Sequence, residues 1–586
     1  MRPYIREAKK IIDAVLCLIR PSHATCYGIP LLLRLLTAAS SGMLHEVTVE
    51  ERFMLSFQSA SLVLRFFCLA VSLGLLGACS PQKYKTQADK EVYQIIDSKW
   101  QDSFGHKANY TVSDVEPSPN DIRAEENVPS GVITLSQAVA LATARNREYQ
   151  RQKEQLYLSA LDLTLARHQF ARRWFGTFDA AYNKDAADER VGAGGDLGFN
   201  QLLADGAQIS AGIALDWTRF LTGDPRTSLG SILTANVTQP LLRGSGRKVA
   251  QENLTQAERS TLYQIRTFNR FRKTFVVSII TDYYRVLQAA DAMKNAGNSY
   301  DRKVELRKRL QMEADEGRTA RFQVDQAEQS EFNAKDTSIR AQQTYQQQLD
   351  EFKIRLSLPT DANIALDQSA LETLRQAGVI EPNYTLNAAV STALARRLDL
   401  ANSADTVDDT QRKVMVAADN LGVELNLVGS AGVGSPEGTD FSRLQFHRGT
   451  YRLGVEGDLP LDRKAERNAY RESLISLQQR QREYENHTDT VKLEVRQALR
   501  RLQEAAESYK TQQLSLELAR KRVEVSPLLW EAGRTTTRDL LESQDALLLA
   551  ENSLTGALVD HTIAKLNFFR DIDVLQVRPD GMWQEQ

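Results

Sequence analysis

Residues 491–569 form a long, nearly proline-free helical pattern that folds once at a glycine. Its apolar residues step by four and three in turn, which is the spacing of a coiled-coil seam and not the wider stripe of a helix on a globular core. Such a seam needs another helix against it, so we predict an antiparallel helical hairpin that turns at Gly533. The seam positions are Val491, Val495, Ala498, Leu502, Ala505 and Tyr509, then Leu540, Leu547, Leu554 and Leu558 on the return.

The same pattern occurs earlier, around a second Gly-Arg-Thr turn at Gly317. Helix openings recur as well, because Thr134-Leu-Ser-Gln-Ala-Val is echoed by Thr385-Leu-Asn-Ala-Ala-Val. Two echoes at similar separation indicate an internal duplication, which we place over residues 132–360 and 383–576 with a linker over 361–382. The helix that opens at Thr134 is predicted to run to about residue 173. The earlier seam is formed by Ile279, Tyr283, Val286, Ala290 and Met293, then Tyr345, Leu349, Phe352 and Leu356.

A compact export signal begins at Met54. Arg65 supplies its positive end, an apolar run follows, and Leu76-Gly-Ala-Cys79 forms the cleavage site. Those four residues resemble a bacterial lipobox, in which the cysteine is lipidated and becomes the mature N-terminus. By the same analogy Ser80, the next residue, permits transfer to the outer membrane. The alternative is a buried cysteine at the end of an apolar core helix.

These features divide the N-terminal part into three predicted segments. Residues 1–53 are interpreted as a mis-assigned start, 54–78 as a lipoprotein signal peptide and 79–131 as a polar tether, with lipidation at Cys79. At the other end, residues 577–586 form a C-terminal tail.

Between the helices of each repeat the apolar period changes to two, as in strands with one apolar and one polar face. Each stretch has about ten residues, close to the length of a tilted transmembrane strand. Strands of a soluble sandwich alternate in the same way. The alternating stretches are 209–217 and 233–237 in the first repeat, 423–427 and 451–455 in the second, and a further segment at Phe178, Ala180 and Tyr182.

Three other features favour strands in a membrane. The chain has an export signal, the predicted mature part has no aliphatic run of about 18 residues, and the helices are too long for a sandwich. Residues 183–200, which are rich in Gly and Asp, and residues 435–450 are then predicted to be exposed loops.

Composition argues against several other classes of function. The 73 basic and 75 acidic residues give a net charge of −2, which provides no electrostatic basis for binding nucleic acid. No cysteine follows Cys79, so a disulfide framework or cysteine metal site beyond it is excluded. No histidine has a partner at metal-binding spacing, and no catalytic constellation is found. We therefore predict a protein that is not an enzyme and uses no metal or cofactor.

With these pieces assembled, residues 132–576 resemble the bacterial outer-membrane efflux proteins, the TolC-type channels. The resemblance is carried by the duplicated plan, the Thr-Leu-x-x-Ala-Val openings, Gln239-Pro-Leu-Leu with Gly246-Arg247, and the two Gly-Arg-Thr turns. It implies an α+β membrane protein in which duplicated long helical hairpins form a periplasmic tunnel. It also implies a homotrimer, with four strands per subunit contributed to one transmembrane β-barrel.

The resemblance also implies candidate site residues. In this family acidic residues just after the second hairpin turn narrow the tunnel, and the matching positions are Asp539 and Glu542. Rings of like charge repel one another and favour cations; the alternative is that both are ordinary solvated helix residues. The first repeat has Gln323 at the equivalent place. Pro527 is expected to kink the helix that enters this turn. The turn residues Gly317, Arg318, Gly533 and Arg534 lie where an adaptor would touch.

The sequence thus predicts a lipid-anchored outer-membrane channel that extends into the periplasm. It would be the passive exit duct of a tripartite efflux or type I secretion system. Its partners would be a periplasmic adaptor (membrane fusion) protein, an inner-membrane transporter and outer-membrane lipid. The alternative is a non-channel coiled-coil lipoprotein that acts as a spacer or scaffold.

Overall fold

The structure is a computed structural model, which describes residues 80–107, 109–112, 131–185, 188–221, 227–380, 384–436, 441–459, 461–578 and 583–585. The predicted export signal and Cys79 lie outside these residues. The chain divides into two units, residues 1–85 and 86–586, and the description below concerns the second. In the described part of the chain, no helix has the length and apolar character needed to cross a bilayer.

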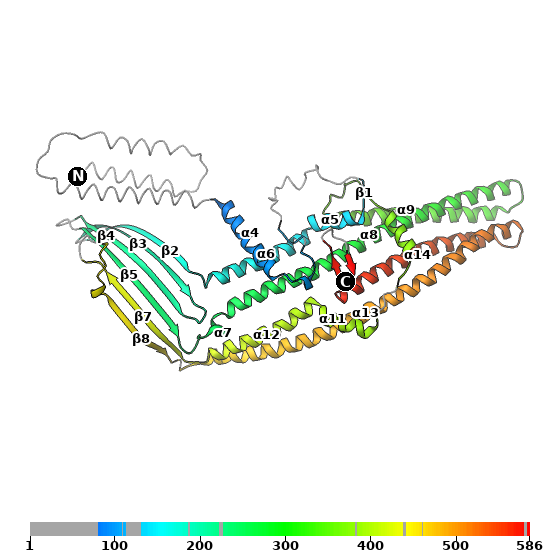
Figure 1. The fold of residues 1–586 in the computed structure, drawn as a ribbon. Coiled ribbons are helices and arrows are strands. Elements are labelled where there is room, and N and C mark those ends of the chain that lie inside the picture. The colour runs from blue at the N-terminus through cyan, green and yellow to red at the C-terminus, as the bar shows by residue number, and fades with distance from the viewer. Residues whose placement is uncertain are drawn as a thin grey trace, which may run out of the picture. The chain divides into compact units, whose positions relative to one another are not determined.

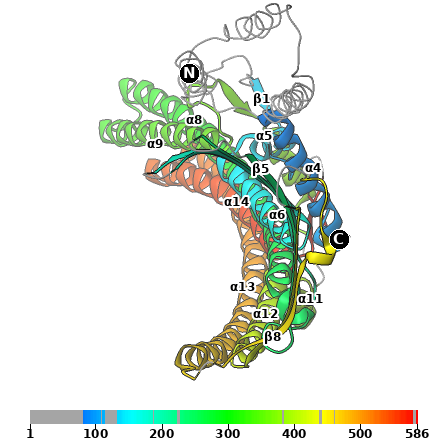
Figure 2. The same cartoon turned by 90° about the vertical axis from the view of Figure 1, so that its left-hand side faces the viewer.

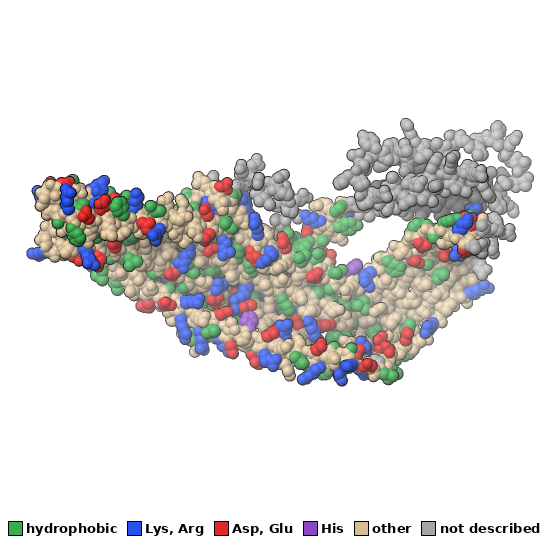
Figure 3. All heavy atoms as spheres, turned by 180° about the vertical axis from the view of Figure 1, so that it is seen from behind, with side chains coloured by type: hydrophobic (Ala, Val, Ile, Leu, Met, Phe, Trp, Pro, Cys, Tyr) green, Lys and Arg blue, Asp and Glu red, His purple; other side chains and the backbone are tan. Residues whose placement is uncertain are grey.

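Two long helical hairpins form the frame of the second unit, as the heptads predict (Figure 1). The first joins α8 (Glu252–Asp315) to α9 (Arg321–Arg355), and the second joins α13 (Lys464–Glu531) to α14 (Thr537–Asp571). At about 1.5 Å per residue, α8 and α13 are each roughly 100 Å long. α13 continues through Pro527 to its last residue. On the face seen in Figure 3, acidic and basic side chains are intermixed along the helices.

The helix that opens each repeat is broken after three turns, which corrects the prediction of one helix to about residue 173. α5 (Leu135–Arg145) ends at Asn146 and α6 (Arg147–His168) begins there, because Asn146 has extended backbone angles. Its side-chain oxygen caps α6 by accepting from the backbone N–H groups of Glu148 and Tyr149. Its side-chain amide donates to the carbonyl of Arg355 at 2.8 Å. α11 (Leu386–Arg396) and α12 (Leu398–Asp419) are broken in the same way at Arg397.

Shorter elements complete the chain and close the apolar core midway along α8. The largest buried side chains there are aromatic or aliphatic and come from both repeats. The remaining elements are α4 (Pro81–Lys99), η1 (Asp102–Phe104), β1 (Gly131–Ile133), α7 (Arg247–Ala250), β6 (Ile364–Leu366), α10 (Ser369–Ala377), η4 (Phe446–Arg448), β9 (Leu575–Val577) and β10 (Trp583–Glu585).

One antiparallel sheet lies at the end of the frame opposite the hairpin turns (Figure 1). It contains six strands, where four were predicted, in the order β2-β3-β4-β5-β7-β8. The fold class is otherwise confirmed, and Figure 2 shows the sheet and helices following one arc. The bounds are β2 (Arg173–Lys184), β3 (Glu189–Leu202), β4 (Gln208–Phe220), β5 (Thr227–Pro240), β7 (Glu424–Gly434) and β8 (Thr450–Asp458).

The exposed loop predicted over residues 183–200 is wrong, because β3 occupies most of it. Its glycines serve close packing. A Cβ at Gly198 would lie 2.7 Å from the carbonyl oxygen of Ala211 on β4 and 2.7 Å from the ring of Phe175 on β2. Glycine inside a strand commonly marks such an approach. By contrast, the described residues between β7 and β8 form no strand, as predicted for 435–450.

The two faces of this sheet keep their character across all six strands. Registered partners share a face, and Phe199 on β3 lies opposite Trp174 on one side and Ala211 on the other. The same face continues through Ala235 and Ala431 to Tyr451. It is apolar and exposed, with Trp174 67%, Leu197 59% and Leu453 79% exposed. The opposite face carries Thr177, Asp196, Ser210, Asn236, Ser430 and Arg452.

A buried ion network holds the break between α11 and α12. The guanidinium of Arg397 forms two contacts with Asp399, of 2.7 and 3.1 Å, and a further ion pair with Glu494 of α13. Arg270 of α8 lies 3.2 Å from Asp399, so the network joins three helices. Burial by itself would raise the pKa of Asp399, but the hydrogen bonds from Arg397 and the nearby positive charges lower it to about 2.

Replacement of Gly198 by alanine should destabilise the sheet, because the backbone oxygen of Ala211 cannot move aside cheaply. We expect Gly198→Ala to lower the unfolding free energy by about 1–3 kcal/mol. Gly454→Ala is the matched control, since Gly454 is on the same face and has no atom within 4 Å of an added Cβ. Thermal melts of the detergent-solubilised protein, followed by circular dichroism, would measure both. Equal melting of the two variants would contradict the close approach.

Stability should depend on pH through Asp399. Its folded pKa of about 2 lies below the ordinary value of about 3.9, so its contribution is complete above about pH 4 and is lost as pH falls toward 2. Asp399→Asn should therefore cost roughly 2 kcal/mol at neutral pH and flatten the loss of stability in acid. The exposed Asp361→Asn serves as control. Urea unfolding midpoints between pH 2 and 7 would test this, and parallel curves for parent and Asp399→Asn would refute it.

Candidate functional site at the hairpin tips

Both hairpins turn at a glycine with left-handed backbone angles, where φ is +72° at Gly317 and +64° at Gly533. The following arginine closes each turn. The N–H of Arg318 donates to the carbonyl of Glu313, and that of Arg534 to the carbonyl of Leu529, both at 2.8 Å. These are Schellman motifs, which favour glycine at this position. The four predicted turn residues therefore lie at the two hairpin ends, and both arginine side chains are exposed.

Asp539 is the third residue of α14 and forms a capping box with Thr536. Its Oδ2 accepts from the N–H and the hydroxyl of Thr536, at 3.0 and 2.6 Å, and from the hydroxyl of Thr535 at 2.9 Å. Its own N–H donates to the hydroxyl of Thr536. The hydrogen bonds from Thr536 and Thr535 lower the pKa of Asp539. The carboxylate thus stays ionised and fixes the start of the helix.

Glu542 lies nearly one helical turn further along α14 and is 61% exposed. Its Oε1 accepts from the guanidinium of Arg522 on α13 at 3.2 Å. An exposed pair of this kind is weak, so the Glu542 carboxylate can exchange Arg522 for solvent or a mobile ion. Of the two predicted acids, Glu542 is the one without a role in helix capping.

The two tips are tied together by contacts that the sequence reasoning missed. The hydroxyl of Thr537, which is 2% exposed, donates to Gln323 of the first hairpin at 2.9 Å and accepts from Trp530 at 3.2 Å. Arg309 of α8 pairs with Glu531 of α13 at 2.7 Å and lies over the ring of Trp530. A small apolar cluster supports these bonds, formed by Leu306, Leu310, Val324, Ala327, Leu540 and Leu541. The hairpins therefore end as one unit.

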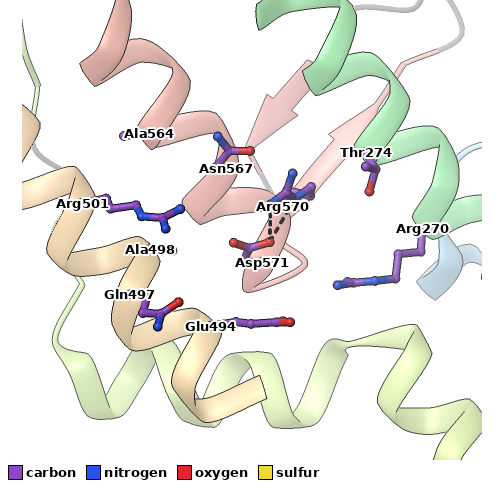
Figure 4. Close-up of a pocket in the computed structure, with 10 residues that line it drawn as sticks. All are labelled: Arg270, Thr274, Glu494, Gln497, Ala498, Arg501, Ala564, Asn567, Arg570 and Asp571. Atoms are coloured by element: carbon purple, nitrogen blue, oxygen red, sulfur yellow. Dashed lines mark hydrogen bonds and ion pairs between the residues drawn. The ribbon is translucent and has the colours of Figure 1, made fainter. Parts of the chain in front are cut away.

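A cavity of about 500 Å³ lies midway along the frame, between α8, α13 and α14 (Figure 4). Most of its charged lining residues have ion-pair partners, one of them within the lining and two outside it. Asp571 pairs with Arg570 at 2.8 Å, Glu494 pairs with Arg397, and Arg270 lies beside Asp399. Within the described ranges, no group of three His, Cys, Asp or Glu side chains could hold a metal ion. The lining residues are Arg270, Thr274, Glu494, Gln497, Ala498, Arg501, Ala564, Asn567, Arg570 and Asp571.

One family model matches part of the second repeat. Residues 389–568 match the family described as Outer membrane efflux protein. A search of curated proteins found no match.

Solved structures of outer-membrane channels share the fold. The CmeC channel of Campylobacter jejuni has a TM-score of 0.55 at 14% identity, over 82% of this chain and 96% of that one. VceC of Vibrio cholerae has 0.53 at 13%, over 75% and 95%. The open-state MtrE channel of Neisseria gonorrhoeae has 0.53 at 12%, over 75% and 88%. Residues 389–568 thus match the outer membrane efflux protein family, and the chain shares the fold of these outer-membrane channels.

Proposed function

We propose that this protein is the outer-membrane channel of a tripartite efflux or type I secretion system, through which small molecules or proteins pass without a chemical step. The observation that carries the proposal is the sheet. One of its faces is apolar, with exposed side chains on β2, β3, β4, β5 and β8, and the other is mainly polar. An apolar face of this size is stable against lipid and not in water. A coiled-coil spacer, the competing function, would leave this face in water.

The proposed partners are inferred from the same sheet and helical hairpins. A single protomer presents an arc with two open sheet edges, so the channel is proposed to be a homotrimer that closes around its lumen. It uses no cofactor and catalyses no reaction. A periplasmic adaptor and an inner-membrane transporter supply the energy for transport. The exposed turns at Gly317, Arg318, Gly533 and Arg534 are the proposed adaptor contact, since they form the end of the frame opposite the sheet.

The proposed aperture is a ring of Glu542, with Asp539 contributing charge from its capping position. Support comes from their place one turn inside the tip and from the exposure of Glu542. Three carboxylates brought together by threefold symmetry repel one another and attract cations.

The lipid anchor at Cys79 and the division of the chain into leader (1–53), signal peptide (54–78), tether, two repeats and tail remain proposals based on the sequence. Lipidation would hold the start of the tether at the membrane. Residues 81–99 of that segment form α4, which packs Val92, Ile95 and Ile96 into the core.

The channel should conduct ions in planar bilayers, and Glu542→Gln should move its cation-to-anion permeability ratio toward one. The reason is that the substitution removes a ring of negative charge while leaving size unchanged. Glu507→Gln is the control, because Glu507 is also an exposed acid, lies on α13 and is paired with Lys510. Reversal potentials in a salt gradient give the ratio. Absence of any conductance would favour the spacer, whereas unchanged selectivity would remove Glu542 from the aperture only.

Cys79→Ser should abolish acylation, because Cys79 would be the only cysteine in the predicted mature chain. We expect radiolabelled palmitate to enter the parent and not the variant, and mass spectrometry of the parent to show a chain that begins at Cys79. Ser80→Ala is the control at the neighbouring position. Equal labelling of Cys79→Ser and the parent would disprove the assignment of the lipobox.

A further inference from the structure

We infer that each protomer contributes six strands to the membrane ring, and that the free edge of β2 in one protomer pairs with the free edge of β8 in the next. The inference rests on the proposed function as a trimeric channel. Three such contributions form a ring of eighteen strands, in place of the twelve that four strands per subunit would give.

The hairpin of β2 and β3 is a continuation of the sheet along its full length. Pairing of β2 with β3 runs from Arg173 opposite Asn200 to Lys184 opposite Glu189. Pairing of β3 with β4 then runs from Leu202 opposite Gln208 to Arg190 opposite Phe220. The β2–β3 hairpin is therefore as tall as the strands beside it.

The apolar face of the hairpin is exposed on the side that would meet lipid. Trp174, Phe178 and Tyr182 of β2 are 67%, 65% and 56% exposed, and all lie on the apolar face of the sheet. An extracellular hairpin in water would have no reason to display three aromatic side chains on one face. Lipid is the environment that stabilises them.

The spacing of these aromatic residues matches a membrane strand. Trp174 and Tyr182 are eight residues apart, about 26 Å along the strand. They lie near opposite ends of β2, as aromatic residues do at the two interfaces of transmembrane barrels. The ring of Trp174 also packs against Phe199 on β3, with centroids 5.3 Å apart.

The opposite face of the hairpin is mainly polar, with Phe175 as an exposed apolar residue, and it continues the polar face of β4. Thr177 of β2 donates to Asp196 of β3 at 3.2 Å. Asp216 of β4 lies on the same face. It pairs with Gly194 of β3, which pairs with Asp179, two residues after Thr177 on β2. The hairpin thus has one face suited to lipid and one suited to an aqueous lumen, as a barrel wall requires.

The two edges of the six-stranded sheet fit each other. Both β2 and β8 have one side without a strand partner among the described residues. An open edge in lipid leaves backbone N–H and C=O groups unsatisfied, at several kcal/mol each. Because β2 and β8 run in opposite directions, they can pair as the rest of the sheet does. Leu453 and Val455 of β8 continue the apolar face at 79% and 64% exposure.

A wider ring changes what can pass. Barrel diameter grows roughly in proportion to strand number, so eighteen strands give a ring about 1.5 times as wide as twelve. Barrels of 16–18 strands enclose an aqueous channel. The outer-membrane part of this duct would then be too wide to select among small solutes, and the tips would impose the narrowest point.

Cysteine accessibility tests whether the hairpin is in the wall. The full chain in lipid bilayers would carry Thr177→Cys on the polar face of β2 or Ala180→Cys on its apolar face, with Asn236→Cys and Ala235→Cys on β5 as the matched pair. We expect a charged thiol reagent to modify Thr177→Cys and Asn236→Cys and to reduce their current, and to leave Ala180→Cys and Ala235→Cys unmodified. Equal modification of both β2 positions with unchanged current, while the β5 pair keeps its contrast, would overturn the inference. Loss of contrast at β5 would instead overturn the proposed channel.

Disulfide formation tests the contact between protomers. Thr177→Cys would be combined in turn with Arg452→Cys, Gly454→Cys and Glu456→Cys, which are same-face positions on β8. We expect one register to give covalent trimers under mild oxidation, visible on denaturing gels and absent in either single variant. Failure of all three combinations would overturn the pairing of β2 with β8.

Discussion

Side chains alternate between the two faces of a strand, and the character of this sheet follows from that alternation. In a hydrogen-bonded ladder, registered partners point to the same face of the sheet, so a slip of one residue would move aromatic side chains to the polar face. Here the register carries Trp174, Phe199, Ala211 and their partners across six strands without a break. The sheet therefore has two chemically distinct sides before any helix or other protomer contacts it.

The helices solve a different problem, which is to keep a long rod rigid. Each hairpin buries one seam, and the central core around α8 joins both repeats. At the far end Thr537, Gln323 and Trp530 share hydrogen bonds between the hairpins. A movement of one tip must therefore break buried polar contacts or carry the other tip with it.

Much of this fold could be predicted from residue spacing, because heptads, turn glycines and alternating strands are local signals. The strand β3 was missed since its glycines resemble a loop, and contacts with β2 and β4 explain those at Gly194, Gly195 and Gly198. The break at Asn146 depends on the carbonyl of Arg355, which is far away in the sequence. The same holds for Gln323 and Thr537. The cap at Asp539 could be predicted from the sequence, because Thr536 precedes it by three residues, as in a capping box.

The β2–β3 hairpin starts and finishes at the same border of the sheet, beside the helices. The chain enters it from α6 and leaves it toward β4 without changing the direction of either neighbour. A unit of this kind can be gained or lost whole during evolution, because every other strand keeps its orientation and its facing. The circumference of such a conduit would then grow in steps of one hairpin per protomer, while the helical part below is left intact.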